Sequence, residues 1–222
     1  MAYKFEFSVV VENSGVLAQG ALHTLELCAA SMLAALVVAL GTLQMRTSKW
    51  AVLRWIAIAY IESIRNTPFL LQLYFFFFAL PTLGVRLTPN MAAILALSIN
   101  GGAYAAEIIR GGMAAVPKGQ REAGFALGLR KFQVFRLIVL KPTLRAIYPA
   151  LTSQFILLLL TSSIVAAISA TELTSAAQML DSITFRSFEI YFTVTAIYLV
   201  LSLMFSRLFN WLYPILFPYP VR

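Results

Sequence analysis

Five long apolar runs constrain the fold of this sequence more than any other feature. They cover residues 15–45, 66–85, 87–109, 146–171 and 190–213, and none contains more than one charged residue. A helix that crosses the hydrocarbon core of a bilayer needs about 20 mostly apolar residues. The sequence therefore predicts an all-α membrane protein with five transmembrane helices.

The overall composition agrees with this prediction. Of the 222 residues, 60% are hydrophobic and 12% are charged, whereas a soluble domain has about 25% charged residues. Lys4 is followed by Glu6 and Glu12 before the first apolar run, so the N-terminus lacks the basic region of a signal peptide. We expect a transmembrane domain over residues 15–215, preceded by an external segment at 1–14 and followed by a cytoplasmic tail at 216–222.

The positions of the basic residues predict the orientation of the chain. Residues 46–65 and 107–145 hold 12 of the 17 Lys and Arg residues. Cytoplasmic loops of membrane proteins carry an excess of such residues. This places both segments in the cytoplasm, the N-terminus outside and the C-terminus inside. The net charge of +8 then reflects topology, and we predict no nucleic-acid partner.

Several kinds of chemistry are excluded by the residues that are missing. Cys28 and His23 are the only residues of their types, so neither an intrachain disulfide nor a zinc site is expected. They are five positions apart and lie on different faces of a helix, which argues against a thiol nucleophile with a histidine base. The sequence has no phosphate-binding G-x-x-x-x-G-K-[ST] loop. We predict no catalytic residue, no metal and no cofactor in this chain.

The segment 110–145 is too long for a simple connection. Between Pro117 and Pro142 it contains a helix-forming stretch that is rich in apolar and basic residues. One interpretation is an amphipathic segment on the bilayer surface. The other is a docking element for a cytoplasmic partner, in which Gly124 and Gly128 permit a turn or a close approach.

Four separated blocks carry a recognisable pattern: GALHTLEL at 20–27, the stretch at 61–81, NGGAYAAEIIRGGMAAVPKGQREAGFALGLR at 100–130, and the run at 161–177. In this order they resemble the permease subunits of bacterial ABC importers, specifically the polar amino acid uptake family. The resemblance implies the type I ABC importer permease fold, with five transmembrane helices and a cytoplasmic coupling helix. It also implies ATP-driven import of polar amino acids across the inner membrane.

The same resemblance assigns the coupling residues. In the family motif, EAA followed by a glycine, Glu122 and Ala123 match, Gly124 replaces the second alanine, and Gly128 is the motif glycine. The usual later proline is Lys141 here, and Pro142 follows it. Glu122 alone could also serve only to stabilise the first turn of its helix. The implied ATPase contacts are Glu122, Ala123, Gly124, Gly128, Leu129 and Arg130.

The resemblance also implies the partners. They are an ABC ATPase dimer that holds ATP and Mg, a second permease chain that is identical or homologous, a periplasmic amino-acid-binding protein, and membrane lipid. Two other functions are open from the residues alone, namely a secondary carrier and a membrane scaffold whose basic loop binds lipid. The lack of a detectable inverted repeat argues against the carrier.

Polar side chains inside the spans are candidates for the substrate pathway, because such groups usually face the interior of a helix bundle. Glu26 could bind a cationic ligand group or lie near the outer interface, and we favour the interface. A lysine common in relatives before the Thr-Ser-Ser stretch is Leu160 here. The pathway candidates are Asn100, Tyr104, Gln154, Thr161, Ser162, Ser163 and Glu26.

Two further groups of residues carry expectations. Ser98, Gly102 and Ala106 recur every four residues, which is a helix-packing pattern in membranes, and for Gly102 we favour packing over pore lining. Between the last two predicted spans, Glu172, Asp181 and Arg186 are candidates for docking the binding protein. The alternative for these three is an ordinary solvated loop.

Overall fold

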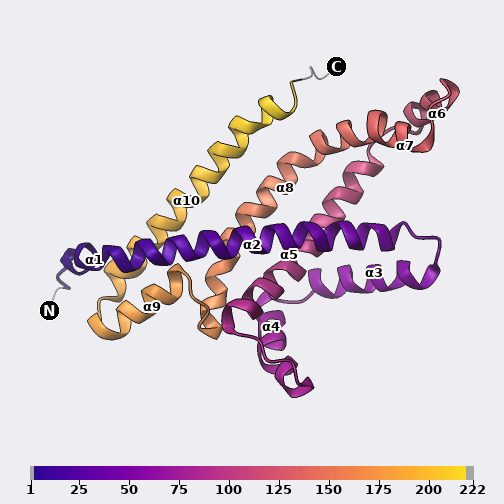
Figure 1. The fold of residues 1–222 in the computed structure, drawn as a ribbon. Coiled ribbons are helices and arrows are strands. Elements are labelled where there is room, and N and C mark those ends of the chain that lie inside the picture. The colour runs from indigo at the N-terminus through magenta and orange to yellow at the C-terminus, as the bar shows by residue number, and fades with distance from the viewer. Residues whose placement is uncertain (1–2, 219–222) are drawn as a thin grey trace.

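The computed structural model describes residues 3–218, and this part of the chain is helical without any strand (Figure 1). Residues 1–2 and 219–222 of the predicted terminal segments lie outside the described part. The helices are α1 (Ser8–Glu12), α2 (Ser14–Arg46), α3 (Ala51–Arg65), α4 (Phe69–Tyr74), η1 (Phe75–Ala79), η2 (Leu80–Leu83), α5 (Pro89–Ala114), α6 (Lys118–Ala126), α7 (Lys131–Gln133), η3 (Val134–Leu140), α8 (Lys141–Thr161), η4 (Ser162–Ile168), α9 (Leu173–Thr184) and α10 (Ser187–Leu216).

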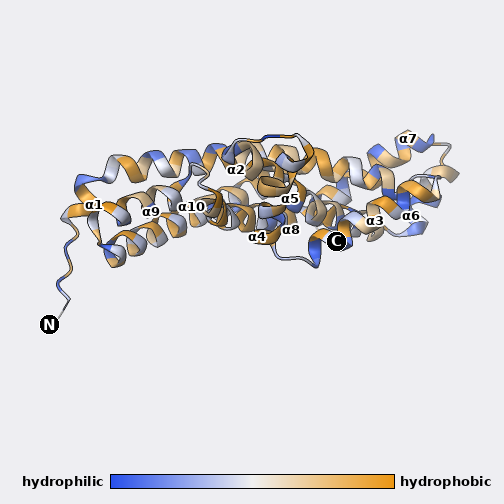
Figure 2. Cartoon of the chain, turned by 90° about the horizontal axis from the view of Figure 1, so that it is seen from below, coloured by the Kyte–Doolittle hydropathy of each residue, from blue (hydrophilic) through white to orange (hydrophobic). Residues whose placement is uncertain are grey.

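Four helical stretches are long and apolar enough to cross a membrane. They are α2, α5, the continuous stretch Lys131–Ile168, and α10. A fifth candidate is the pair Ala51–Arg65 and Phe69–Leu83, which is bent by 114°. Figure 2 shows apolar residues along much of the length of the helices and hydrophilic residues around α6 and α7. The structure confirms the all-α fold with up to five spans.

The region around the predicted second span differs from the sequence expectation. Residues 66–85 do not form one straight helix, because α4 passes into the π-helix η1 and the 3-10 helix η2. Residues 51–65, which we assigned to a basic loop, form α3. The break falls just before Pro68, as expected from the restriction that a proline places on the preceding residue.

The predicted loop at 110–145 is also shorter in the structure. Helix α5 continues to Ala114, and a helix resumes at Lys131. Only residues 115–130 separate the two helical stretches, and they contain α6. Pro142 lies at the start of α8, directly after the π-helix η3. Since proline has no N–H to donate, the wider turns of η3 precede a position where regular α-helical bonding is interrupted.

Helices α2 and α5 make the most extensive contact in the bundle. Ser98, Gly102 and Ala106 are all buried. A Cβ atom on Gly102 would lie 2.6 Å from Cγ1 of Val38 in α2. The prediction that these small residues serve helix packing is therefore confirmed, because only small residues permit this approach.

Candidate functional site

The short helix α6 has an exposed face at one end of the bundle (Figure 1). Glu122 and Ala123 are exposed on it. Glu122 lies beyond the first turn, and no side chain caps this helix. The interpretation of Glu122 as a simple stabiliser of the first turn is therefore not supported.

Gly128 ends α6 with a defined backbone geometry. Its φ angle is +77°, a left-handed conformation that glycine adopts at little cost. The Gly128 N–H donates to the Phe125 carbonyl at 2.9 Å, and the Leu129 N–H donates to the Gly124 carbonyl at 3.1 Å. These two bonds form a Schellman motif, which fixes the direction of the chain after α6. Leu129 is partly buried and Arg130 is exposed.

Gly124 lies on the face of α6 that packs against the same chain. It is buried, and a Cβ atom there would lie 2.4 Å from Ile138 Cδ1 and 3.1 Å from Val134 Cγ2. The glycine therefore brings α6 onto η3 of the same chain. Arg121 adds a second attachment, since its Nη2 donates to the Met113 carbonyl of α5 at 2.7 Å. Helix α6 is thus connected to both α5 and the η3–α8 helix.

Asn100 belongs to a polar cluster at the break between α3 and α4. Its Nδ2 donates to Oε1 of buried Gln72 at 2.9 Å. The Gln72 Nε2 donates to the Ile64 carbonyl at 2.8 Å, and to the carbonyl and Oγ1 of Thr67 at 3.1 and 2.9 Å. Gln72 therefore connects both sides of the break to α5. We did not select Gln72 from the sequence, although its amide within the apolar run 69–73 was a usable signal.

Tyr104 lies one turn beyond Asn100 on the same helix. The guanidinium of Arg65, the last residue of α3, lies 5.4 Å from the centre of the Tyr104 ring. This distance is typical of a cation–π interaction. The pathway candidates on α5 thus both face the α3–α4 region, and the structure adds Gln72 and Arg65 to them.

The substrate-pathway candidates on α8 and η4 lie outside the polar cluster of Asn100 and Gln72. Gln154 is half-buried on α8. Ser162 is fully buried and donates to the Leu159 carbonyl at 2.7 Å, while Ser163 donates to the Leu160 carbonyl at 2.8 Å. Thr161 is the last residue of α8 and is half-buried. Within residues 3–218, none of these four side chains forms a hydrogen bond with Asn100 or Tyr104.

A cavity of about 420 Å³ lies between α8 and α10. Its lining includes polar side chains that were not selected from the sequence, namely Tyr148, Thr152, Ser153, Ser206 and Asn210. Polar groups on membrane-length helices usually face water or other protein groups. Beside the cavity the Tyr148 hydroxyl of α8 donates to the Phe209 carbonyl of α10 at 2.9 Å, so the two helices are joined there.

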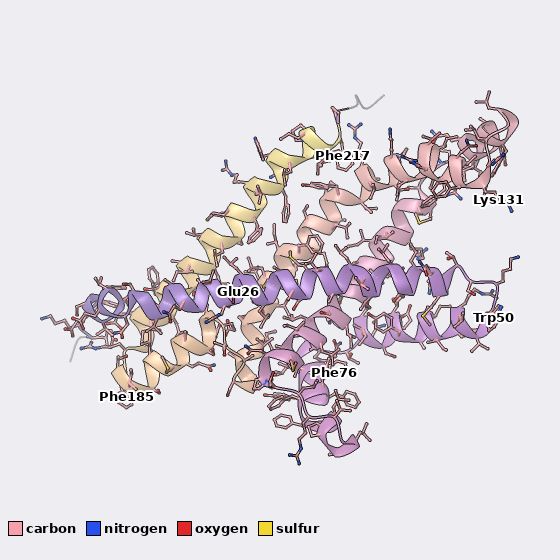
Figure 3. The ribbon with its side chains drawn as sticks, viewed as in Figure 1. Glu26, Trp50, Phe76, Lys131, Phe185 and Phe217 are labelled. Carbon is pink, nitrogen blue, oxygen red and sulfur yellow. The ribbon has the colours of Figure 1, made fainter. Side chains whose placement is uncertain are left out.

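Glu26 lies on α2 (Figure 3). Its side chain is 64% exposed, and its Oε2 lies 3.2 Å from His23 Nδ1 on the preceding turn. The expectation that Glu26 lies near the outer interface stays a prediction.

Glu172 is not part of an exposed docking surface, so this expectation was wrong. The residue is fully buried at the N-cap of α9. Its carboxylate accepts hydrogen bonds from Ser175 N at 2.6 Å, Thr174 N at 2.7 Å and the Tyr198 hydroxyl at 2.7 Å. Burial raises the pKa of this carboxyl above its usual value, although the hydrogen bonds oppose the shift. Glu172 serves to join α9 to α10.

Asp181 and Arg186 lie at the turn between α9 and α10. The Ser187 hydroxyl donates to the Asp181 carboxylate at 2.7 Å. Arg186 Nη2 donates to Glu6 Oε2 at 2.7 Å, so its charge has a partner within the chain. Asp181 and Arg186 stay candidates for docking.

The residues before α1 form an N-terminal strap, residues 3–7, on the beginning of α10. Buried Glu189 accepts hydrogen bonds from the Tyr3 hydroxyl at 2.6 Å and from Glu6 N at 2.8 Å. The Phe5 ring contacts the Phe188 ring edge-on, with centroids 5.6 Å apart. The strap therefore connects the first described residues to the start of α10, at the end of the bundle opposite α6 (Figure 1).

Replacing Gln72 with leucine is expected to lower the stability of the protein by about 2 kcal/mol, because it leaves the Asn100 amide and two backbone carbonyls without their partner. The measurement is the midpoint of thermal unfolding in detergent. Gln178→Leu is the control, since Gln178 is exposed on α9. Equal midpoints for the two variants would contradict a structural role for the Gln72 cluster.

Solved structures of transporters share this fold. A solved amino acid ABC transporter with histidines is 34% identical to this chain, with a TM-score of 0.89, and the match covers 95% of this chain and 99% of that chain. The MetNI methionine ABC transporter in an inward-facing conformation matches with a TM-score of 0.76 at 21% identity, over 92% of this chain and 98% of that chain. The fold is that of an ABC importer permease.

Sequence comparisons agree with the fold. Residues 29–217 match the model of the family described as binding-protein-dependent transport system inner membrane component. The glutamine transport system permease protein GlnP of Escherichia coli K12 is 35% identical over 205 residues, which cover 91% of this chain and 94% of that protein. The probable glutamine ABC transporter permease protein GlnM of Bacillus subtilis is 34% identical, over 92% and 95% of the two chains. The chain belongs to this permease family, and the carrier and scaffold alternatives find no support.

Proposed function

We propose that this chain forms the transmembrane pathway of an ATP-driven importer of polar amino acids in the bacterial inner membrane. The main observation behind the proposal is the exposure of Glu122 and Ala123 on α6. This short helix is attached to two long helices, α5 and η3–α8. The names of the relatives support the substrate class, since they include glutamine permeases and the L-cystine transport system permease protein TcyB of Bacillus subtilis, which is 34% identical over 86% of this chain and 82% of that protein.

The partners follow from what this chain lacks. Its sequence contains no phosphate-binding loop, so ATP and Mg belong to a separate ATPase dimer that receives α6. A second permease chain completes the pathway, and a periplasmic binding protein delivers the substrate. The excess of Lys and Arg in residues 46–65 and 107–145 supports a cytoplasmic position for α6, with the N-terminus outside and the C-terminus inside. Asp181 and Arg186 then lie on the outer side, where the binding protein docks.

The attachments of α6 provide a route for coupling. A movement of α6 acts on α5 through the bond from Arg121 to Met113, and on η3–α8 through the contact at Gly124. Helix α5 carries Asn100 and Tyr104, and α8 ends at Thr161. The two helices that hold most of the pathway candidates therefore move with the coupling helix. The amide, hydroxyl and phenol groups of these candidates supply hydrogen bonds for the polar parts of an amino acid.

The test is ATP hydrolysis and amino acid uptake in proteoliposomes that contain the chain with its co-purified ATPase and binding protein. Glu122→Ala is expected to reduce substrate-stimulated hydrolysis about tenfold, because a hydrogen bond to a charged group contributes about 1.5–3 kcal/mol. Glu62→Ala, which removes an exposed acid from α3, is the control. Uptake that needs no ATP, or that is equally insensitive to both substitutions, would contradict the proposal.

A further inference from the structure

An apolar groove lies between α2, α5 and the η3–α8 helix. It has a volume of about 360 Å³, and its walls include Leu40 and Leu43 of α2, Met113 of α5, and Phe135, Leu144 and Leu151 of η3–α8. Leu40 is 51% exposed and Leu144 is 43% exposed, so the groove opens to the outside of the bundle.

The groove is long enough to hold an acyl chain of one bilayer leaflet. The lining residues on η3–α8 run from Phe135 to Leu151, which corresponds to roughly 24 Å at the rise of an α-helix. The hydrocarbon part of one leaflet is about 15 Å thick. One acyl chain can therefore lie along the groove within a single leaflet.

The groove continues into a smaller cavity whose walls carry positive charge. This cavity has a volume of about 190 Å³ and shares Met113, Phe135 and Val139 with the groove, and it adds Arg121 and Lys131. No acidic residue is found among the described residues that line either cavity. An apolar channel that ends at two cations complements a molecule with an acyl chain and an anionic head.

Both cations retain capacity to bind an anion. Arg121 donates to the Met113 carbonyl through Nη2, whereas its Nη1 makes no hydrogen bond within residues 3–218. Lys131 is exposed beside α6 (Figure 3), and it makes no ion pair within residues 3–218. A phosphate between these two side chains would use donors that the folded chain leaves available.

We infer that this groove binds an anionic phospholipid, with an acyl chain along Leu40 and Leu144 and the phosphate between Arg121 and Lys131. The inference rests on the orientation given in the proposed function, because that orientation places the charged end in the cytoplasmic leaflet, where anionic lipids are concentrated. The phosphate lies next to α6. Bound lipid therefore stabilises the coupling helix against α5 and η3.

Native mass spectrometry of the delipidated permease complex, titrated with phosphatidylglycerol, tests this site. Lys131→Gln is expected to weaken the tightest bound lipid about fivefold, the equivalent of about 1 kcal/mol for one basic residue at a membrane surface. Arg136→Gln is the matched control, because Arg136 is an exposed base of the same segment that lines neither cavity. Phosphatidylcholine as the probe is expected to show no difference between the two variants.

A second pair of variants tests the acyl-chain part of the site. Leu40→Trp fills the groove and is expected to remove the tight phosphatidylglycerol, whereas Val37→Trp on the same helix changes a residue outside the groove and is expected to leave it bound. Equal losses for Lys131→Gln and Arg136→Gln would show diffuse charge attraction and overturn the inference. A groove covered by a second copy of the chain would also overturn it, and Leu40→Trp would then change the oligomeric state instead. Lipid binding needs no transport, so its result is independent of the uptake assay.

Discussion

Gly102→Val is expected to destabilise the protein by about 3 kcal/mol and to prevent much of it from folding, because there is no room for a side chain where α5 crosses α2. A Cβ atom at this position lies 2.6 and 2.9 Å from two atoms of Val38 and 3.2 Å from the Ala35 carbonyl oxygen. The backbone oxygen cannot move without shifting α2, and added volume in a packed core costs about 1–3 kcal/mol. The measurement is the thermal unfolding midpoint of the protein that can be extracted in detergent.

Gly111→Val is the control for this prediction. Gly111 lies on the same helix, and a Cβ atom there meets nothing within 4 Å. Adding Val38→Ala to Gly102→Val is expected to restore part of the lost stability, since it removes Cγ1 of Val38, the atom nearest to the new side chain. If the Gly102 and Gly111 variants unfold at the same temperature, the close approach of α2 and α5 is not what requires the glycine.

Gly124→Val is expected to reduce substrate-stimulated ATP hydrolysis about tenfold, which corresponds to about 1.4 kcal/mol of coupling free energy. The substitution places atoms where Ile138 and Val134 now contact α6, so the helix must move away from η3. The assay is ATP hydrolysis in proteoliposomes with and without substrate-loaded binding protein. Gly119→Val on the same helix is the control, because its surroundings are open.

The double variant Gly124→Val with Ile138→Ala distinguishes two explanations of a loss. If the glycine serves the internal contact, the smaller residue at 138 makes space and coupling returns toward the normal value. If coupling stays lost, the glycine instead permits a close approach of the ATPase, as the motif alone suggested. A Gly124→Val protein with normal coupling would contradict both explanations.

The apolar runs were sufficient to predict α2, α5 and α10, because a run of uncharged residues reflects the environment of a membrane-length helix directly. The same criterion missed α3, which contains Arg54, Glu62 and Arg65. The composition of a segment also does not determine the angle between successive helices, so the 114° bend after α3 was not predicted. Four-residue spacing of small residues did predict the packing of Gly102, because that spacing is a property of helix surfaces.

The candidate site was predicted less completely than the fold. Glu172 was expected to face solvent because it is charged and lies between spans, whereas its partner Tyr198 is 26 residues away. A local signal was present, since Glu172 and Ser175 have the spacing of a capping box. Gln72 and Asn100 are 28 residues apart, and nothing in the local sequence relates them. Such pairs depend on how the helices cross, which the apolar pattern does not specify.

The N-terminal strap has a consequence for how the protein is made. Residues 3–7 leave the ribosome about 180 residues before Arg186 and Glu189. Until the start of α10 is synthesised, the Tyr3 hydroxyl and the Glu6 carboxylate lack their partners Glu189 and Arg186. Closing so long a loop carries an entropic cost that the intervening packed helices must first reduce. The strap is therefore among the last contacts to form, and a chain that stops before α10 keeps its first residues unanchored.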